Sequence, residues 1–262
     1  MLAPCASSAT RMRIAEGLEM LDLEMKLGDR TMTIHPIIVY DHESWTLVDT
    51  GMPGSASNIL AHAKQIGISS NSLQAIILTH QDIDHIGSLP EFIADRGAAA
   101  FEVYAREEDR DTIDGKAPLL KFPQERLNAE LDSLPAELRA QFESIFLHPS
   151  KPNVTRLVED GETLPIGGGL TVIHTPGHTP GHFSLYHQAS KTLIAGDALV
   201  VHNGELLGSS PYSTVNMEQA IRSVEKFKAF DIETVVCYHG GLLSGDMNKR
   251  IADLIAQLAT LE

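Results

Sequence analysis

The chain has 262 residues, of which 43% are hydrophobic and 21% are charged, and its formal net charge is −15. This length and apolar content suffice for a packed core, which excludes an intrinsically disordered protein. The acidic balance argues against nucleic acid and against an anionic membrane surface as partners, and no apolar run approaches the roughly 20 residues that span a bilayer.

The N-terminus and the cysteines indicate the cellular setting. Residues 1–11 are predicted to form a loose extension, followed by one domain over residues 12–262. The start of the chain lacks the basic and apolar regions of a signal peptide. Cys5 and Cys237 cannot form a disulfide scaffold, and Cys237 ends an apolar run, which predicts a buried and inert thiol. We therefore expect a reduced, cytoplasmic protein.

The first half of the chain alternates predicted strands and helices. Short apolar runs predict strands or extended chain over residues 31–40, 45–49, 73–79 and 101–104. Apolar residues at helical spacing, a capping Ser55 or Ser57 and the terminating Gly67 predict a helix over residues 55–66. Residues 88–96 and the charge-rich residues 105–114 are also expected to be helical.

The middle of the chain is predicted to be helical, without strands. Residues 123–147 contain helix formers and spaced Leu and Phe side chains without a strand pattern, which predicts a helical insertion over about residues 118–150. Two roles stay open for this insertion. It forms a lid over an active-site cleft, or it is a plain structural excursion or a homodimer contact.

The second half repeats the alternation. Strands are predicted over residues 170–174, 183–187, 192–195 and 232–238, and helices over residues 217–229 and near the C-terminus. Asn216 is the expected cap of the first of these helices. Strands grouped in each half, with a helix closing each group, predict two αβ halves packed sheet to sheet.

Groups of potential metal ligands follow four of the predicted strands. They are His80-Gln81-Asp82-Ile83-Asp84-His85, the TPGHTPGH loop of residues 175–182, Gly196-Asp197, and His239-Gly240-Gly241. Strand ends are rigid and can aim side chains into one cleft, which a metal site requires. One such group alone is usually a solvated turn or a surface histidine, but four in this order predict a shared metal site.

These motifs, together with Val48-Asp49-Thr50-Gly51, resemble the metallo-β-lactamase superfamily of binuclear metallohydrolases over nearly the whole chain. The resemblance implies an α+β fold, the four-layer αββα sandwich, with two metal ions at one edge between the sheets. It further implies that Asp197 bridges the two ions and that Asp49 and His182 support the site without binding metal. The implied ligands are His80, Asp82 and His178 for the first ion, and Asp84, His85 and His239 for the second.

One position departs from the usual His-x-His-x-Asp-His signature, because Asp82 stands where the second histidine is expected. A carboxylate is a harder ligand than imidazole, so this site should accept Mn²⁺ or Fe²⁺ better than the parent site. Zinc stays the first expectation, since Asp is an ordinary zinc ligand. The alternative is that Asp82 points away and the first site is weakened or empty.

A hydroxide that bridges two metal ions is a nucleophile at neutral pH, so we expect hydrolysis of a small molecule with an ester or lactone type bond. Asp84 is the candidate to carry a proton to the leaving group. The TPGHTPGH loop and the insertion resemble the branch of lactonases and glyoxalase-II-like enzymes. However, the tyrosine that lactonases carry shortly after the bridging Asp is missing before Tyr212. The candidate substrate contacts are Tyr212, His202, Phe122 and Leu119.

The sequence leaves other functions open. A thioesterase or phosphoesterase would use the same metal centre. Diiron redox proteins of the superfamily also carry a carboxylate at the position of Asp82, but this chain has no flavodoxin-like domain with a Gly-rich phosphate loop. A metal-free binding module should have lost several ligands, whereas all seven positions hold residues that can bind metal.

Overall fold

The computed structural model describes residues 11–27, 30–96 and 101–260. Residues 1–10 of the expected N-terminal extension, with Cys5, lie outside these ranges. Arg11, the last residue of the predicted extension, instead begins the first strand. None of the helices in the described part of the chain is both long and apolar enough to cross a membrane.

The first half of the chain builds a seven-stranded sheet in the order β1-β2-β5-β6-β7-β8-β9. The strands from β1 to β6 pair antiparallel, and those from β6 to β9 pair parallel. Their bounds are β1 (Arg11–Ala15), β2 (Leu18–Leu21), β5 (Ile37–Tyr40), β6 (Trp45–Val48), β7 (Leu73–Ile77), β8 (Glu102–Ala105) and β9 (Arg156–Leu157). The outer face of this sheet packs against α1 (Ala56–Gln65) and α3 (Leu89–Arg96) through one apolar cluster.

The second half builds a six-stranded sheet in the order β10-β11-β12-β13-β16-β17. The bounds are β10 (Thr163–Leu164), β11 (Leu170–His174), β12 (Phe183–His187), β13 (Thr192–Ile194), β16 (Thr234–Cys237) and β17 (Gly241–Ser244). Its outer face is covered by α7 (Met217–Val224), the 3-10 turn η3 (Glu225–Ala229) and α8 (Met247–Leu258). The side chain of Asn216 accepts from Gln219 N at 3.0 Å, so Asn216 caps α7 as predicted.

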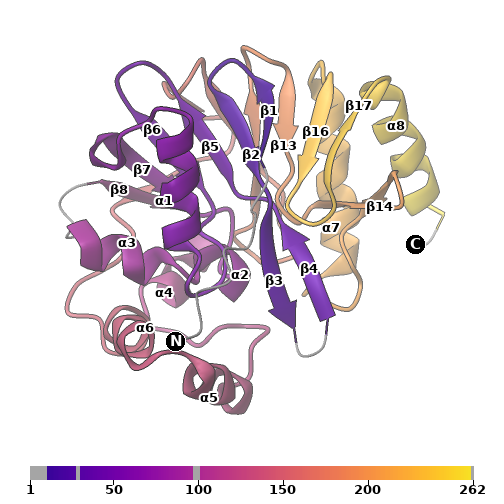
Figure 1. Cartoon of the computed structure of the whole chain (residues 1–262). Coiled ribbons are helices and arrows are strands. Elements are labelled where there is room, and N and C mark those ends of the chain that lie inside the picture. Colours follow the sequence, from indigo (N-terminus) through magenta and orange to yellow (C-terminus); the bar gives the residue numbers. More distant parts are fainter. Residues whose placement is uncertain (1–10, 28–29, 97–100, 261–262) are drawn as a thin grey trace.

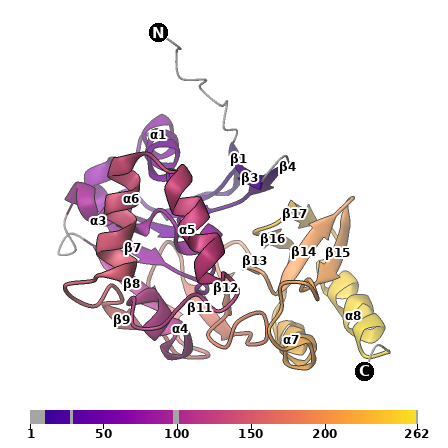
Figure 2. The ribbon, with the colours of Figure 1, turned by 90° about the horizontal axis from the view of Figure 1, so that it is seen from below.

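The two sheets pack face to face, and their inner faces form a separate apolar core. Ile37, Val48 and Ile77 from the first sheet belong to the same buried cluster as Val172 and Leu185 from the second. Helices therefore lie outside both sheets, as the two views show (Figures 1 and 2). The predicted αββα sandwich is confirmed.

Two hairpins stand apart from the main sheets. β3 (Leu23–Leu27) pairs with β4 (Arg30–Ile34), and β14 (Leu199–His202) pairs with β15 (Glu205–Gly208). The prediction of one strand over residues 31–40 is wrong, because β4 and β5 are separated at His35-Pro36. Pro36 has no N–H to donate to a ladder, and the N–H of His35 donates instead to Tyr238 O at 3.0 Å.

The segment predicted as an insertion contains α5 (Gln124–Ser133), α6 (Ala136–Phe142) and the π-helical turn η2 (Glu143–Leu147). Leu127, Leu131, Phe142 and Phe146 are buried in the same cluster as the outer face of the first sheet. The insertion thus continues the outer helical layer, beside α3 and α4 (Glu107–Ile113) (Figure 2).

The predicted ligand groups all lie where strands end. Asp49 follows β6, His80 follows β7, Asp197 follows β13, and His239 follows β16. β6 and β7 are parallel neighbours, and so are β13 and β16. Parallel neighbours end at the same edge of a sheet, so this topology gathers the groups at one edge of the sandwich.

Candidate metal centre

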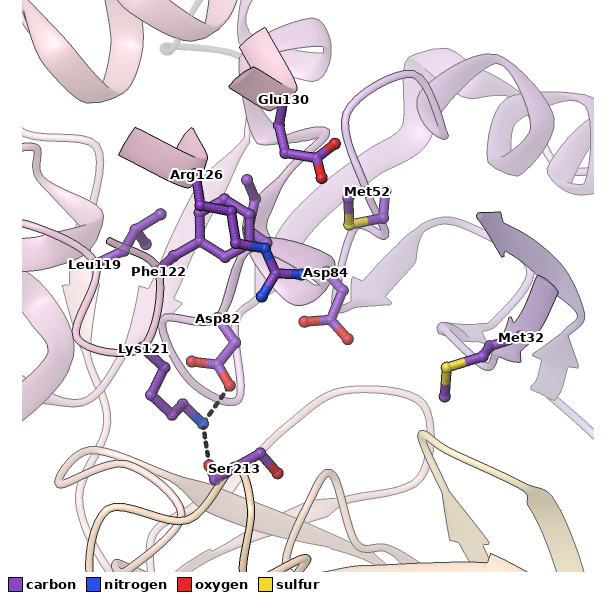
Figure 3. A pocket seen from close by; sticks show the side chains of 11 residues that line it. Met32, Met52, Asp82, Asp84, Leu119, Lys121, Phe122, Arg126, Glu130 and Ser213 are labelled. Atoms are coloured by element: carbon purple, nitrogen blue, oxygen red, sulfur yellow. Dashed lines mark hydrogen bonds and ion pairs between the residues drawn. The ribbon is translucent and has the colours of Figure 1, made fainter. Parts of the chain in front are cut away.

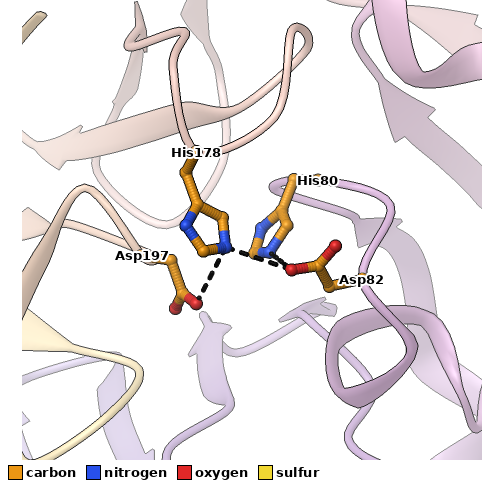
Figure 4. Close-up of side chains that lie close together, drawn as sticks. All are labelled: His80, Asp82, His178 and Asp197. Atoms are coloured by element: carbon orange, nitrogen blue, oxygen red, sulfur yellow. Dashed lines mark hydrogen bonds and ion pairs between the residues drawn. The ribbon is translucent and has the colours of Figure 1, made fainter. Parts of the chain in front are cut away.

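The first group of side chains contains His80, Asp82, His178 and Asp197 (Figure 4). Oδ2 of Asp82 lies 3.3 Å from Nε2 of His80 and 3.0 Å from Nε2 of His178. Nε2 of His178 lies 3.2 Å from Oδ2 of Asp197. Asp82 therefore points toward the histidines, which is the orientation a ligand needs.

The second group contains Asp84, His85 and His239, with Asp84 and His85 on the short helix α2 (Ile83–Ile86). Oδ2 of Asp84 lies 3.3 Å from Nε2 of His239 and 3.8 Å from Nε2 of His85. Asp197 faces this group as well, since its carboxylate oxygens lie 3.5 Å from Nε2 of His85 and 3.4 Å from Nε2 of His239. Asp197 thus lies between the two groups, where a bridging ligand would be.

The donor atoms fit metal cations. Nε2 of His80, Nε2 of His85 and Oδ1 of Asp197 are buried and have no hydrogen-bond partner. Buried polar atoms are normally paired, and a bound ion is one explanation for such exceptions. Burial lowers the pKa of His239, but Asp197 and Asp84 outweigh burial and raise this pKa to about 10. The carboxylates therefore favour a cation at this position, and each group could hold a divalent ion.

Asp49 orients the ring of His85 through its Nδ1 atom, the nitrogen that does not face the other candidate ligands. Its Oδ2 lies 2.9 Å from Nδ1 of His85, and it also accepts from the hydroxyl of Thr79 at 2.8 Å. Because this hydroxyl donates to Asp49, it accepts from Nδ1 of His80 at 3.1 Å. The rings of His80 and His85 therefore carry their proton on Nδ1. Each directs the lone pair of Nε2 toward the other candidate ligands of its group, as in other carboxylate–histidine–metal arrangements.

His182 supports the site in a different way. Its Nε2 accepts the backbone N–H of Asp197 at 2.9 Å, and its Nδ1 lies 2.9 Å from the hydroxyl of Thr175. With its Nε2 lone pair engaged by this N–H, the ring positions Asp197 and has no donor atom left for a metal.

Sequence reasoning missed Asp109 on α4. Its buried carboxylate accepts from Gln81 N at 3.1 Å, from Gly181 N at 2.9 Å and from the hydroxyl of Thr179 at 2.6 Å. Burial raises the pKa of Asp109, and these donors offset that cost. Asp109 thus ties the loop of His80 to the loop of His178. Its place in a charged helix gave no sign of this role.

Two further residues near the site also escaped prediction. Tyr238 packs its ring against His85 with the centroids 3.8 Å apart, and its hydroxyl donates to Asp84 O at 2.5 Å. Lys121, from the insertion, forms an ion pair with Asp82 (Figure 3) and places its Nζ 2.6 Å from Nε2 of His178. Neither residue belongs to a recognisable motif.

A cavity of about 240 Å³ opens beside the two groups of candidate ligands, with one carboxylate from each group in its lining (Figure 3). Leu119 and Phe122, two of the predicted substrate contacts, line it together with Asp82 and Asp84. The full lining is Met32, Met52, Asp82, Ile83, Asp84, Leu119, Lys121, Phe122, Arg126, Glu130 and Ser213.

The other two predicted contacts do not line this cavity. The side chain of Tyr212 is fully exposed, although its neighbour Ser213 reaches the lining. His202 lies exposed at the end of β14. The position of Tyr212 therefore gives no support to its use as a replacement for the lactonase tyrosine.

Comparisons with known proteins identify the family of the chain. Residues 33–239 match the family model of the metallo-beta-lactamase superfamily. The probable metallo-hydrolase YflN of Bacillus subtilis is 31% identical over 230 residues, which cover 83% of this chain and 84% of the relative. The human acyl-coenzyme A thioesterase MBLAC2 is 30% identical over 146 residues, 53% of this chain and 46% of that protein.

The fold is also found in solved structures. The crystal structure of a metallo-beta-lactamase family protein from Thermus thermophilus superposes with a TM-score of 0.67 at 23% identity, covering 95% of this chain and 81% of that one. The family match spans most of the sequence, and YflN is similar over most of both chains. The chain therefore belongs to the metallo-β-lactamase superfamily and is a metallo-hydrolase of that superfamily.

Proposed function

We propose that the protein hydrolyses ester-type bonds, carboxylic esters or thioesters, in small molecules with an apolar acyl group. The observation that carries this proposal is the cavity that joins the carboxylates of Asp82 and Asp84 to the apolar side chains of Leu119 and Phe122. An acyl chain packed against Leu119 and Phe122 would place the carbonyl of the substrate next to the candidate metal ligands.

The proposed metal ligands are His80, Asp82, His178, Asp84, His85, His239 and Asp197. Two divalent ions held there would supply Lewis acidity and lower the pKa of water, which makes it a nucleophile at neutral pH. Zinc is the first expectation for this ligand set, and Asp82 makes the first site better able to accept manganese or iron than a site with histidine at this position.

Residues of the chain would transfer the proton to the leaving group and orient the metal ligands. Asp84 lines the cavity and also faces His239, so its carboxylate can carry a proton to the leaving group. Asp49 and His182 hold His85 and Asp197 in place from outside the ligand set.

Arg126 offers one cationic group at the cavity, beside the carboxylates of Asp82, Asp84 and Glu130 that also line it. The guanidinium of Arg126 stacks over the ring of Phe122 at 4.5 Å, and Lys121 lies deeper, beside Asp82. An ester whose leaving group carries a carboxylate or phosphate could contact Arg126. The name of the human relative supports a thioester as one member of this class.

The test is a substrate panel with metal-loaded protein. We expect hydrolysis of acyl esters or acyl thioesters, loss of the activity with a chelator, and a large loss in Asp84→Asn. The matched control is His202→Ala, an exposed histidine outside the cavity. Activity confined to phosphoesters, or oxygen reduction by an iron-loaded form without hydrolysis, would overturn the proposal in favour of the phosphoesterase or diiron alternative.

The remaining expectations stay predictions. They are a reduced, cytoplasmic setting, a small-molecule substrate, and no nucleic acid or membrane partner. A homodimer contact through the insertion stays the alternative to a lid.

A further inference from the structure

Lys121 reaches from the insertion into the first group of proposed ligands. It forms an ion pair with Oδ2 of Asp82, and its Nζ lies 2.9 Å from Ser213 O (Figure 3). The same Nζ lies 2.6 Å from Nε2 of His178. The side chain is 18% exposed. The ammonium group therefore lies among atoms that come from three separate parts of the chain.

The contact with His178 identifies which lone pair is engaged. A lysine ammonium only donates hydrogen bonds, so Nε2 of His178 accepts in its 2.6 Å contact with Lys121. The same Nε2 lies 3.0 Å from Oδ2 of Asp82, and with Nε2 as an acceptor the ammonium is the donor to both of these atoms. The other ring nitrogen, Nδ1, lies 3.4 Å from the hydroxyl of Thr214, and this hydroxyl donates to Ser210 O at 2.6 Å. The hydroxyl is thus an acceptor for Nδ1–H, which leaves the proton on Nδ1 and the lone pair on Nε2.

An imidazole Nε2 has one lone pair. It can accept a hydrogen bond from Lys121 or bind a metal ion, but it cannot do both at once. Oδ2 of Asp82 is also the oxygen that faces both His80 and His178. Lys121 therefore engages two of the donor atoms that the first metal ion would need.

The second group lacks such a competitor. Among the residues that the structure describes, the ion-pair partners of Asp84 within 4.0 Å are His85 and His239, and no lysine or arginine is among them. The two groups differ in this respect although they share Asp197.

We propose that Lys121 is a tethered cation that competes with the first metal ion for His178 and Asp82. The second site then fills first, and filling of the first site expels Lys121 from the ligand group. This inference rests on the proposed metal centre and not on the hydrolytic reaction.

Expulsion of Lys121 would also move the wall of the cavity. The neighbouring Leu120 N donates to the side chain of Gln81 at 3.2 Å, and Leu119 and Phe122 on either side line the cavity. Metal binding at the first site is thereby coupled to the position of residues 118–123.

The test is a calorimetric titration of the metal-free protein with Zn²⁺ and with Mn²⁺. We expect two unequal classes of site in the parent protein. Lys121→Met, which keeps the length of the side chain without its charge, should raise the affinity of the weaker class at least tenfold and leave the stronger class unchanged. Lys151→Met, an exposed lysine just past the insertion, should match the parent.

Hydrogen exchange supplies an independent readout. Amides of residues 118–123 should change their exchange rate at the second equivalent of metal and not at the first. Lys121→Gln serves if the Met variant fails to fold. Affinities unchanged within twofold in a folded Lys121 variant, or exchange in residues 118–123 unaffected by metal, would overturn the inference. Stepwise metal binding without hydrolysis of any substrate would instead refute the proposed function alone.

Discussion

Oδ2 of Asp49 lies 2.9 Å from Nδ1 of His85, and both side chains are buried. Asp49 is placed there by a left-handed backbone conformation with φ of 62°, directly after β6. Asp49 fixes the tautomer of His85 and thus directs Nε2 toward Asp84 and Asp197.

Replacing Asp49 by Asn should weaken the second site. Without the carboxylate, the ring of His85 loses both its orientation and part of its basicity, and such changes cost about 10–100-fold in metal affinity. Competition with a chromophoric chelator measures this loss. The exposed Asp231→Asn serves as the control, and an Asp49→Asn protein with parental affinity would show that the contact does not tune the site.

Replacing Asp109 by Ala should destabilise both ligand loops. The N–H groups of Gln81 and Gly181 would be left buried without their acceptor, which costs about 1–3 kcal/mol per group. Urea unfolding of the metal-free protein measures the change. Glu107→Ala, at an exposed position on the same helix, should leave the midpoint within error. Equal midpoints for the two variants would contradict this role of Asp109.

Replacing Asp82 by His restores the common signature and should shift the metal preference toward zinc. Imidazole is a neutral, borderline-soft donor, so the variant removes one negative charge and favours later first-row ions. The measurement is metal content after growth in medium with equal zinc and manganese. If content and metal-dependent rates match those of the parent, Asp82 is not a ligand.

Shortening Leu119 or Phe122 to Ala should change which acyl chain is hydrolysed best, because both side chains line the cavity. The expected result is a changed order of KM values across acyl-chain lengths with unchanged metal content. Tyr212→Ala, a fully exposed position, is the control. An unchanged order together with an altered oligomeric state would assign the insertion to a dimer interface.

The sequence was sufficient to predict the sandwich and the convergence of the ligand groups because these depend on local signals. Each group of candidate metal ligands follows a short apolar run that forms a strand. Because these strands end at one edge of the sandwich, the side chains that follow them lie close together. The roles of Lys121 and Asp109 could not be predicted, since their partners are remote: 57 residues separate Lys121 from His178, and 70 separate Asp109 from Thr179.

The first strands escaped prediction for a related reason. Glu19 is the second of the four residues of β2 and interrupts its apolar run, yet it is only 2% exposed, and Tyr40 and Arg11 contact its carboxylate. Pairing across the sheet, and not a local pattern, makes this segment a strand.

The central claim is a two-metal centre in which Asp197 is shared. The most direct measurement is the number of metal ions bound per chain at saturation, determined together with hydrolytic rate for the parent, Asp197→Ala and the control His202→Ala. We expect two ions for the parent and the control, and for Asp197→Ala the loss of at least one ion and of most activity. Two ions and full activity in Asp197→Ala would contradict this claim.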